Sequence, residues 1–239
     1  MKPRFVGHIG PADVVTAAHA AVGVLAVVIA PENIELAARL VLLAAILDGV
    51  DGIVARWHGG TMIGPYLDSL ADVASFAVAP AAIVYVAVTS EWELVSNEPS
   101  VELAVLAIVV VLFVVMAVFR LAMYTAFDTD TSYTEGVQST LAATIIGAAI
   151  LANVTDPIIL LVGTALFTYL MVSPIRYPDL LARDAFLMGI VHTAAVIVPT
   201  AFGRAFPWAL LILGVAYLLL SPWLYWRDSW LLMEWKGNA

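Results

Sequence analysis

The stretch "LDGVDGIVARWHGGTMIGPYLDSLADVASF", residues 47–76, places four aspartates among residues apolar enough for a lipid bilayer. They are Asp48, Asp51, Asp68 and Asp72. A carboxylate inside a membrane costs about 2.5–3.5 kcal/mol on insertion scales, so four of them need water access or compensating charge. Because positions three or four apart share one face of a helix, the stretch predicts two helices whose acidic faces form one site.

The composition predicts that the rest of the chain is embedded in a membrane. Of the 239 residues, 63% are hydrophobic and 12% are charged, whereas soluble domains average about 45–50% and about 25%. Continuous apolar runs of nearly 20 residues favour membrane-spanning helices over a barrel. We therefore expect an all-α integral membrane protein, a polytopic helical bundle of about eight transmembrane helices. The runs lie at about 13–30, 36–56, 66–88, 102–125, 138–153, 157–173, 186–201 and 206–226.

The basic residues predict how this bundle is threaded. If the N-terminus is cytoplasmic, all ten basic residues except Arg39 and Arg204 fall at or near the inner face, as the positive-inside rule requires. We therefore expect both termini in the cytoplasm and a multi-pass protein of the plasma membrane. The four aspartates then face the cytoplasm. The net charge of −9 gives no reason to expect a nucleic acid as partner.

The aspartates are candidate metal ligands. The chain has no cysteine, which excludes disulfides and thiolate ligands. Carboxylates are hard oxygen ligands that suit Mg²⁺, Mn²⁺ or Ca²⁺, and two divalent ions would balance four negative charges. Sites with two metal ions commonly serve phosphoryl chemistry. Arg56 adds a permanent cation for a phosphate group, and Gly49 and Gly52 leave backbone accessible to a bulky ligand.

The spacing of these residues resembles the signature of the CDP-alcohol phosphatidyltransferase family. The chain reads Asp48-x-x-Asp51-Gly52-x-x-Ala55-Arg56, then seven residues, then Gly64-x-x-x-Asp68-x-x-x-Asp72, which matches every position of that signature. The resemblance implies a membrane enzyme that moves a phosphatidyl-type group from a CDP-linked lipid to an alcohol and releases CMP. It implies two divalent cations, Mg²⁺ or Mn²⁺, as cofactors.

The resemblance also implies a role for each signature residue. The four aspartates would bind the metal ions, and Asp72 would also be the catalytic base that deprotonates the acceptor hydroxyl. The CDP-binding residues would be Asp51, Gly52, Ala55, Arg56 and Gly64.

Four further segments resemble the serine-transferring branch of the family, the phosphatidylserine and archaetidylserine synthases. Residues 10–23 keep Thr16 and Gly23 of that branch's opening, but His19 stands where the branch has a second Asn. On an apolar helix, we expect such a histidine to be packed and hydrogen-bonded. The other segments are 119–127, 133–144 and 172–180.

Two of those segments supply candidate acceptor-binding residues. These are Arg120, Arg176 and Tyr177, and an arginine could pair with the carboxylate of L-serine. The acidic, lysine-poor composition makes an archaeal enzyme plausible, with CDP-archaeol as lipid and an archaetidyl group as the one transferred. The other expected partners are membrane lipids and, from the resemblance, a second copy in a homodimer.

We expect one transmembrane domain over residues 1–239. The six-helix family core would occupy about 1–176, and two additional helices about 186–226. Two alternatives stay open. The same chemistry could use inositol phosphate or glycerol 3-phosphate, although phosphorylated acceptors call for a larger basic cluster. A cation transporter could also use intramembrane aspartates, and it would show polar residues at the midplane and broken helices in both halves.

Overall fold

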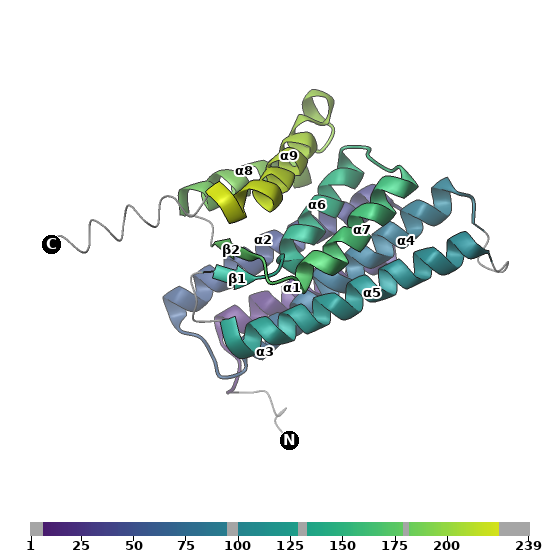
Figure 1. Ribbon diagram of the computed structural model, residues 1–239. Helices are drawn as coiled ribbons and strands as arrows, with labels where there is room; N and C mark the ends of the chain where they lie inside the picture. The colour runs from purple at the N-terminus through teal and green to yellow at the C-terminus, as the bar shows by residue number, and fades with distance from the viewer. Residues whose placement is uncertain (1–6, 95–99, 129–132, 179–181, 225–239) are drawn as a thin grey trace, which may run out of the picture.

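The structure, a computed structural model, describes residues 7–94, 100–128, 133–178 and 182–224. Nearly all of the described chain is helical (Figure 1). The elements in order are α1 (Pro11–Ile29), α2 (Ile34–His58), α3 (Gly64–Asp72), the π-helical η1 (Val73–Val78), α4 (Ala79–Glu91), α5 (Val101–Met123), the π-helical η2 (Tyr124–Asp128), β1 (Tyr133–Glu135), α6 (Ser139–Leu151), α7 (Pro157–Met171), β2 (Arg176–Pro178), α8 (Ala182–Ile197) and α9 (Ala201–Leu224).

The helices follow the apolar runs of the sequence. Because α3, η1 and α4 join into one continuous rod, the described helices coincide with the eight predicted runs. Four of these rods are long and apolar enough to cross a membrane, namely 11–29, 64–91, 101–127 and 201–223. The helices α6, α7 and α8 are shorter but also apolar. The prediction of an all-α membrane protein is confirmed, while the number of crossings and the side of the termini stay predictions.

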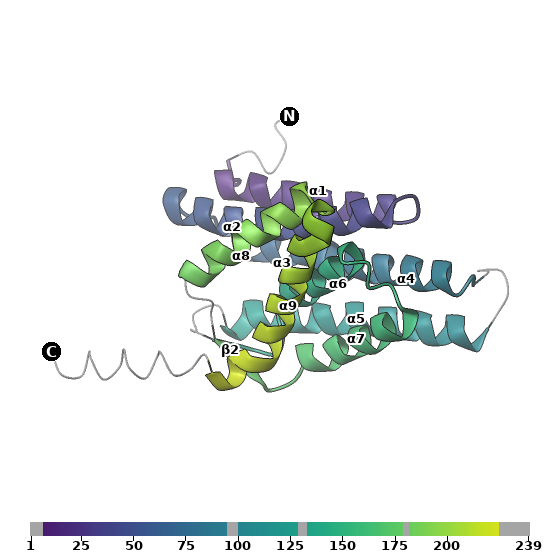
Figure 2. The same cartoon turned by 90° about the horizontal axis from the view of Figure 1, so that it is seen from above.

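The long helices run roughly alongside one another, and α8 and α9 lie together on one side of this bundle (Figure 1). Seen from above, α9 runs across the long helices instead of along them (Figure 2). The core of the bundle is built around α6, which is buried from Ala142 to Leu151. Phe76 of η1 and Phe113 of α5 are fully buried in the same core. Small residues such as Ala and Gly let the helices approach closely, as is usual in membrane bundles.

Two arginines fasten α8 and α9 to the bundle. Arg39 Nε on α2 donates to the carbonyl of Val196 over 2.7 Å. Arg204 donates 2.7 Å hydrogen bonds to Glu35 Oε1 and to the carbonyl of Leu151. Since Glu35 and Arg39 lie in the first turns of α2, whereas Asp48 and Asp51 lie in its second half, these contacts stand at the end of the bundle away from the aspartates.

A short antiparallel ladder, which the sequence did not predict, joins the chain after α5 to the chain after α7. It pairs Tyr133 with Pro178, Thr134 with Tyr177 and Glu135 with Arg176. Gly136 follows with a φ of +78°, and a Cβ there would collide with the carbonyl of Met171. Only glycine adopts this conformation readily, so Gly136 lets the chain leave the ladder against the end of α7.

Candidate active site

The structure brings the four signature aspartates together. Carboxylate oxygens of Asp48, Asp51 and Asp68 lie within 4.8 Å of one another, and so do ligand atoms of His19, Asp48 and Asp72. Asp48 belongs to both groups, which makes one continuous acidic cluster between α2 and α3. Asp51 and Asp72 are buried, with 6% and 8% of their surface exposed, while Asp48 and Asp68 are half-buried.

The loop between α2 and α3 is held in place by the start of α1. The buried carboxylate of Asp13 accepts hydrogen bonds from Thr61 Oγ1, at 2.9 and 3.1 Å, and from the backbone N–H of Gly10 at 2.7 Å. Thr61 lies in the loop that separates the two acidic pairs. The Asp13–Thr61 contact therefore sets how the second pair of aspartates faces the first. Asp13 was not among the predicted site residues, although an acidic residue in the first turn of an apolar helix is a usable signal.

Thr16, one turn further along α1, orients an aspartate directly. Its Oγ1 donates a 2.7 Å hydrogen bond to Asp51 Oδ2, and both residues are buried. A hydrogen bond to a carboxylate is stronger than one between neutral groups. Thr16, one of the residues that carry the resemblance to the serine-transferring branch, thus contacts the acidic cluster directly.

His19 also faces the cluster, and here one expectation was wrong. The residue is fully buried and packs against the Phe76 ring, with ring centroids 4.9 Å apart. Neither ring nitrogen has a hydrogen-bond partner among the described residues, however, so the expected hydrogen-bonded histidine is not found. Its Nε2 lies 4.0 Å from Asp72 Oδ1. The helix changes from α to π directly after Asp72, a change that frequently marks functional sites.

The expected CDP-binding residues lie on the same two helices. Gly52, Ala55 and Arg56 occupy the last two turns of α2, where Arg56 is exposed. A Cβ on Gly52 would meet only Nη1 of Arg56, at 3.6 Å, so the backbone there is open to a ligand. Gly64 begins α3 beside Asp13 and Thr61, and a Cβ there would lie 3.6 Å from an oxygen of each.

Arg120 is a buried positive charge whose electrostatic influence extends to Asp48 and Asp72. It lies in the last turn of α5 and is buried. Its Nη2 donates to Thr134 Oγ1 at 3.1 Å, and its guanidinium lies 5.0 Å from the centre of the Tyr124 ring. Thr134 and Tyr124 thereby hold the positive group beside the acids.

Arg176, the other candidate arginine, has local partners instead. Its Nε donates to Glu135 Oε1 at 3.1 Å, its guanidinium lies over the Tyr133 ring, and its side chain is 57% exposed. Neighbouring Tyr177 is buried and contacts the ring of Tyr217 on α9. Among the contacts that the structure describes, Arg176 has none with the four aspartates.

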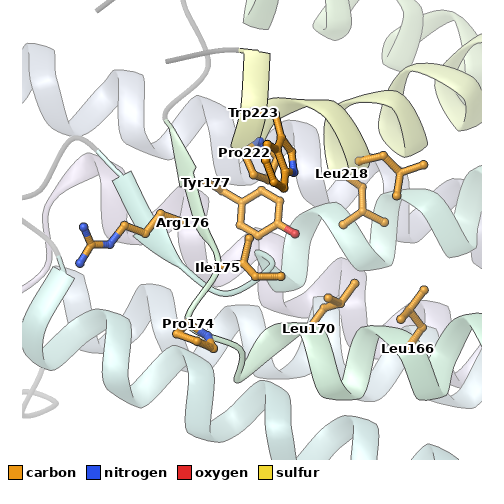
Figure 3. A pocket seen from close by; sticks show the side chains of 10 residues that line it. Leu166, Leu170, Pro174, Ile175, Arg176, Tyr177, Leu218, Pro222 and Trp223 are labelled. Atoms are coloured by element: carbon orange, nitrogen blue, oxygen red, sulfur yellow. The ribbon is translucent and has the colours of Figure 1, made fainter. Parts of the chain in front are cut away.

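A pocket of about 770 Å³ lies between α7, β2 and α9, away from the aspartates. Leu170, Tyr177, Leu218 and Trp223 are among the side chains that line it, and the guanidinium of Arg176 points away from them (Figure 3). The pocket is largely apolar, and no aspartate lines it. The acidic cluster, rather than this apolar cavity, is therefore the candidate active site.

The residues of the cluster fit divalent cations. Asp72 Oδ1 is buried and has no hydrogen-bond partner among the described residues. An unsatisfied buried carboxylate oxygen is costly, and cation binding is one way to satisfy it. Four carboxylates from two helices give the hard oxygen donors that Mg²⁺ and Mn²⁺ accept.

Comparison with known proteins gives the same family as the signature. Residues 11–175 match the CDP-alcohol phosphatidyltransferase family. The chain is 41% identical over 95 residues to a CDP-diacylglycerol–serine O-phosphatidyltransferase of Mycobacterium tuberculosis, covering 39% of this chain and 29% of that protein. It is 35% identical over 154 residues to the protein of that name from Helicobacter pylori, covering 60% and 61%.

An archaeal relative is similar over a shorter stretch. The chain is 36% identical over 86 residues to an archaetidylserine synthase of Methanothermobacter thermautotrophicus, covering 34% of this chain and 37% of that protein. In each of these relatives the match spans less than two thirds of the relative's own length. The family match, in contrast, extends from the start of α1 to the residue before β2 and includes the whole acidic cluster. The chain belongs to the CDP-alcohol phosphatidyltransferase family.

Proposed function

We propose that the protein transfers a phosphatidyl-type group from a CDP-linked lipid to the hydroxyl of L-serine and releases CMP. The observation that carries the proposal is the convergence of Asp48, Asp51, Asp68 and Asp72 in one cluster. The family supports the reaction type, and the names of the relatives support serine as acceptor.

The four aspartates would hold two divalent cations, Mg²⁺ or Mn²⁺. When bound, the cations neutralise charge on the diphosphate and on the CMP leaving group. Thr16 keeps the Asp51 carboxylate in a fixed orientation. Arg56, exposed one turn after Gly52, would bind a phosphate of the CDP group, with Gly52, Ala55 and Gly64 leaving room for the nucleotide.

Asp72 would act as the general base. The serine hydroxyl oxygen forms a bond to the phosphorus that carries the lipid, the bond from that phosphorus to the oxygen bridging to CMP breaks, and the hydroxyl proton passes to Asp72. CMP leaves with the electron pair of the broken bond. A base within reach of the hydroxyl typically contributes about 10²–10⁴-fold to such a step.

Arg120 is the better of the two candidate arginines for the serine carboxylate. It is buried at the cluster, and a guanidinium can bind a carboxylate through two hydrogen bonds. Arg176 and Tyr177 would act from the β1–β2 ladder, which places Thr134 against Arg120. Arg176 and Tyr177 would therefore shape the acceptor site, whereas Arg120 would form its centre.

The remaining parts of the proposal concern the surroundings of the enzyme. The protein would lie in the plasma membrane as a homodimer, with the acidic cluster open to the cytoplasm. The lipid would carry either diacylglycerol or archaeol chains, and an archaetidylserine synthase is among the relatives. The cation-transporter alternative gains no support from the comparisons, since the family and the relatives are named as transferases.

The test is release of CMP by the purified protein from CDP-diacylglycerol or CDP-archaeol with Mg²⁺ or Mn²⁺. L-serine, inositol phosphate and glycerol 3-phosphate are compared as acceptors. We expect CMP only with serine, and only when a divalent cation is present. Release with a phosphorylated acceptor would overturn serine while keeping the catalytic cluster, and no release with any acceptor would overturn the transferase activity.

A further inference from the structure

One face of α1 supplies two polar side chains to the acidic cluster. Thr16 and His19 are three residues apart and therefore share a face of the helix. Thr16 is hydrogen-bonded to Asp51. His19 lies one turn further, where its ligand atom is within 4.8 Å of ligand atoms of both Asp48 and Asp72. Thr16 thus contacts Asp51, and His19 faces Asp48 and Asp72.

His19 is polar, fully buried and without a hydrogen-bond partner at either ring nitrogen among the described residues. Asp72 Oδ1, the oxygen nearest to it, is likewise buried and unsatisfied. Buried polar atoms are nearly always hydrogen-bonded, and exceptions point to a role such as binding an ion. One cation between these two atoms, which lie 4.0 Å apart, would satisfy both of them.

The imidazole is held in this place by contacts other than hydrogen bonds to its ring. The Phe76 ring packs against it, and Ser75 Oγ donates a 3.2 Å hydrogen bond to the His19 carbonyl. Gly23, one turn further along α1, permits the close approach of η1, because a Cβ there would collide with Ser75. Two residues of the π-helical turn after Asp72 therefore hold His19 in place.

We propose that His19 Nε2 is a ligand of the divalent cation that Asp48 and Asp72 bind. This inference rests on the proposed function, which assigns a cation to that pair. Two ligands that each lie about 2.1 Å from one ion are separated by about 3 to 4.2 Å, and the 4.0 Å between Nε2 and Asp72 Oδ1 falls within that range.

The two cation positions would then differ in chemistry. The group of Asp48, Asp51 and Asp68 offers oxygen only, whereas the group of His19, Asp48 and Asp72 offers one nitrogen and two carboxylates. Imidazole favours transition metals over Mg²⁺, which prefers oxygen ligands. The position beside His19 would therefore select Mn²⁺ over Mg²⁺ more strongly than the all-carboxylate position does.

The test uses the purified full chain with Mn²⁺ alone and pulsed electron paramagnetic resonance, which detects nitrogen bonded to manganese. We expect a ¹⁴N coupling in the wild type that changes to a ¹⁵N coupling when the protein is made with ¹⁵N-histidine. The coupling should be lost in His19→Asn and kept in His192→Asn. His192, on α8 outside the cluster, is the matched control for loss of a histidine from a helix. The labelled wild type gives an answer even if a variant fails to fold.

Metal affinities add an independent readout. In His19→Asn we expect Mn²⁺ to bind at least about tenfold more weakly, the lower limit for loss of groups that support a metal, with a smaller change for Mg²⁺. Mn²⁺ bound without any histidine nitrogen would overturn this inference and leave the proposed transferase intact. If no Mn²⁺ or Mg²⁺ bound, and CMP release from serine went on without divalent cations, the inference would fail together with the metal dependence of the proposed function, while the transfer itself would stand.

Discussion

Thr16 Oγ1 on α1 donates a hydrogen bond of 2.7 Å to Asp51 Oδ2 on α2. The contact joins α1 to the first pair of aspartates, Asp48 and Asp51, on α2. We predict that Thr16→Val weakens Mn²⁺ binding by about 10-fold or more, the usual effect of removing a group that orients a metal ligand. Thr16→Ser keeps the hydroxyl and should restore binding. Titration of Mn²⁺ against each variant checks this, and equal binding in Thr16→Val and wild type would show that the hydrogen bond does not prepare the site.

Asp72→Asn should reduce CMP release by about 10²–10⁴-fold, the usual contribution of a general base. Part of the affinity for the CDP-lipid should remain, since three carboxylates stay in place. The matched control is Asp156→Asn, which changes the helix-capping aspartate of α7 outside the cluster. Turnover and lipid binding are measured separately. A parallel loss of both in Asp72→Asn would mark the residue as principally a metal ligand.

Arg120→Lys should raise KM for serine by about tenfold, which corresponds to about 1.4 kcal/mol for one lost charge-assisted hydrogen bond. KM for the CDP-lipid should change much less. Arg176→Lys is the comparison, because Arg176 is exposed and paired with Glu135. We expect a smaller effect on serine there. Steady-state kinetics with each substrate varied in turn would contradict this ranking if Arg176→Lys had the larger effect on serine.

Removal of divalent cations should destabilise the protein, because four neighbouring carboxylates then repel one another. A cation present at about 100 times its Kd stabilises a protein by about 2.7 kcal/mol, which is enough to move Tm by several degrees. Thermal unfolding in detergent with and without chelator measures the difference. The double variant Asp48→Asn with Asp68→Asn should lose this response to chelator, and a wild-type Tm that ignores chelator would argue against a shared site.

Gly136→Ala should destabilise the junction between the β1–β2 ladder and α6. The left-handed conformation of Gly136 costs a residue with a Cβ about 1–2 kcal/mol, and the Cβ would in addition meet the Met171 carbonyl. Gly163→Ala is the control, since a Cβ at Gly163 in α7 meets nothing within 4 Å. Unfolding temperatures should fall for Gly136→Ala and stay close to the wild type for Gly163→Ala.

Periodic and compositional signals were enough to predict the helices. The apolar runs predicted the described helices. The spacing of the four aspartates predicted that they converge, because residues three or four apart share a helix face. These features depend on local geometry, which the sequence encodes directly. The loop from Gly59 to Ile63 then needs only to turn the chain back.

Contacts between distant segments could not be predicted in the same way. Asp13 meets Thr61 across 48 positions, and Thr134 pairs with Tyr177 in a ladder of three-residue strands that is too short for a periodic signal. His19 was expected to be packed and hydrogen-bonded, since most buried histidines are. The predicted packing of His19 is confirmed. Its lack of a hydrogen-bond partner depends on how α1 packs against η1, where Gly23 and Ser75 are adjacent in space.

The β1–β2 ladder also implies an order in which parts of the fold are completed during synthesis of the chain. The four aspartates are all present once synthesis has passed residue 72, so the acidic cluster can assemble before the later helices are made. Thr134, which binds Arg120, gains its ladder partner only after synthesis has reached Tyr177. The acidic cluster can therefore form before the surroundings of Arg120 are complete, and a chain released before residue 177 has all four aspartates but lacks the ladder partner of Thr134.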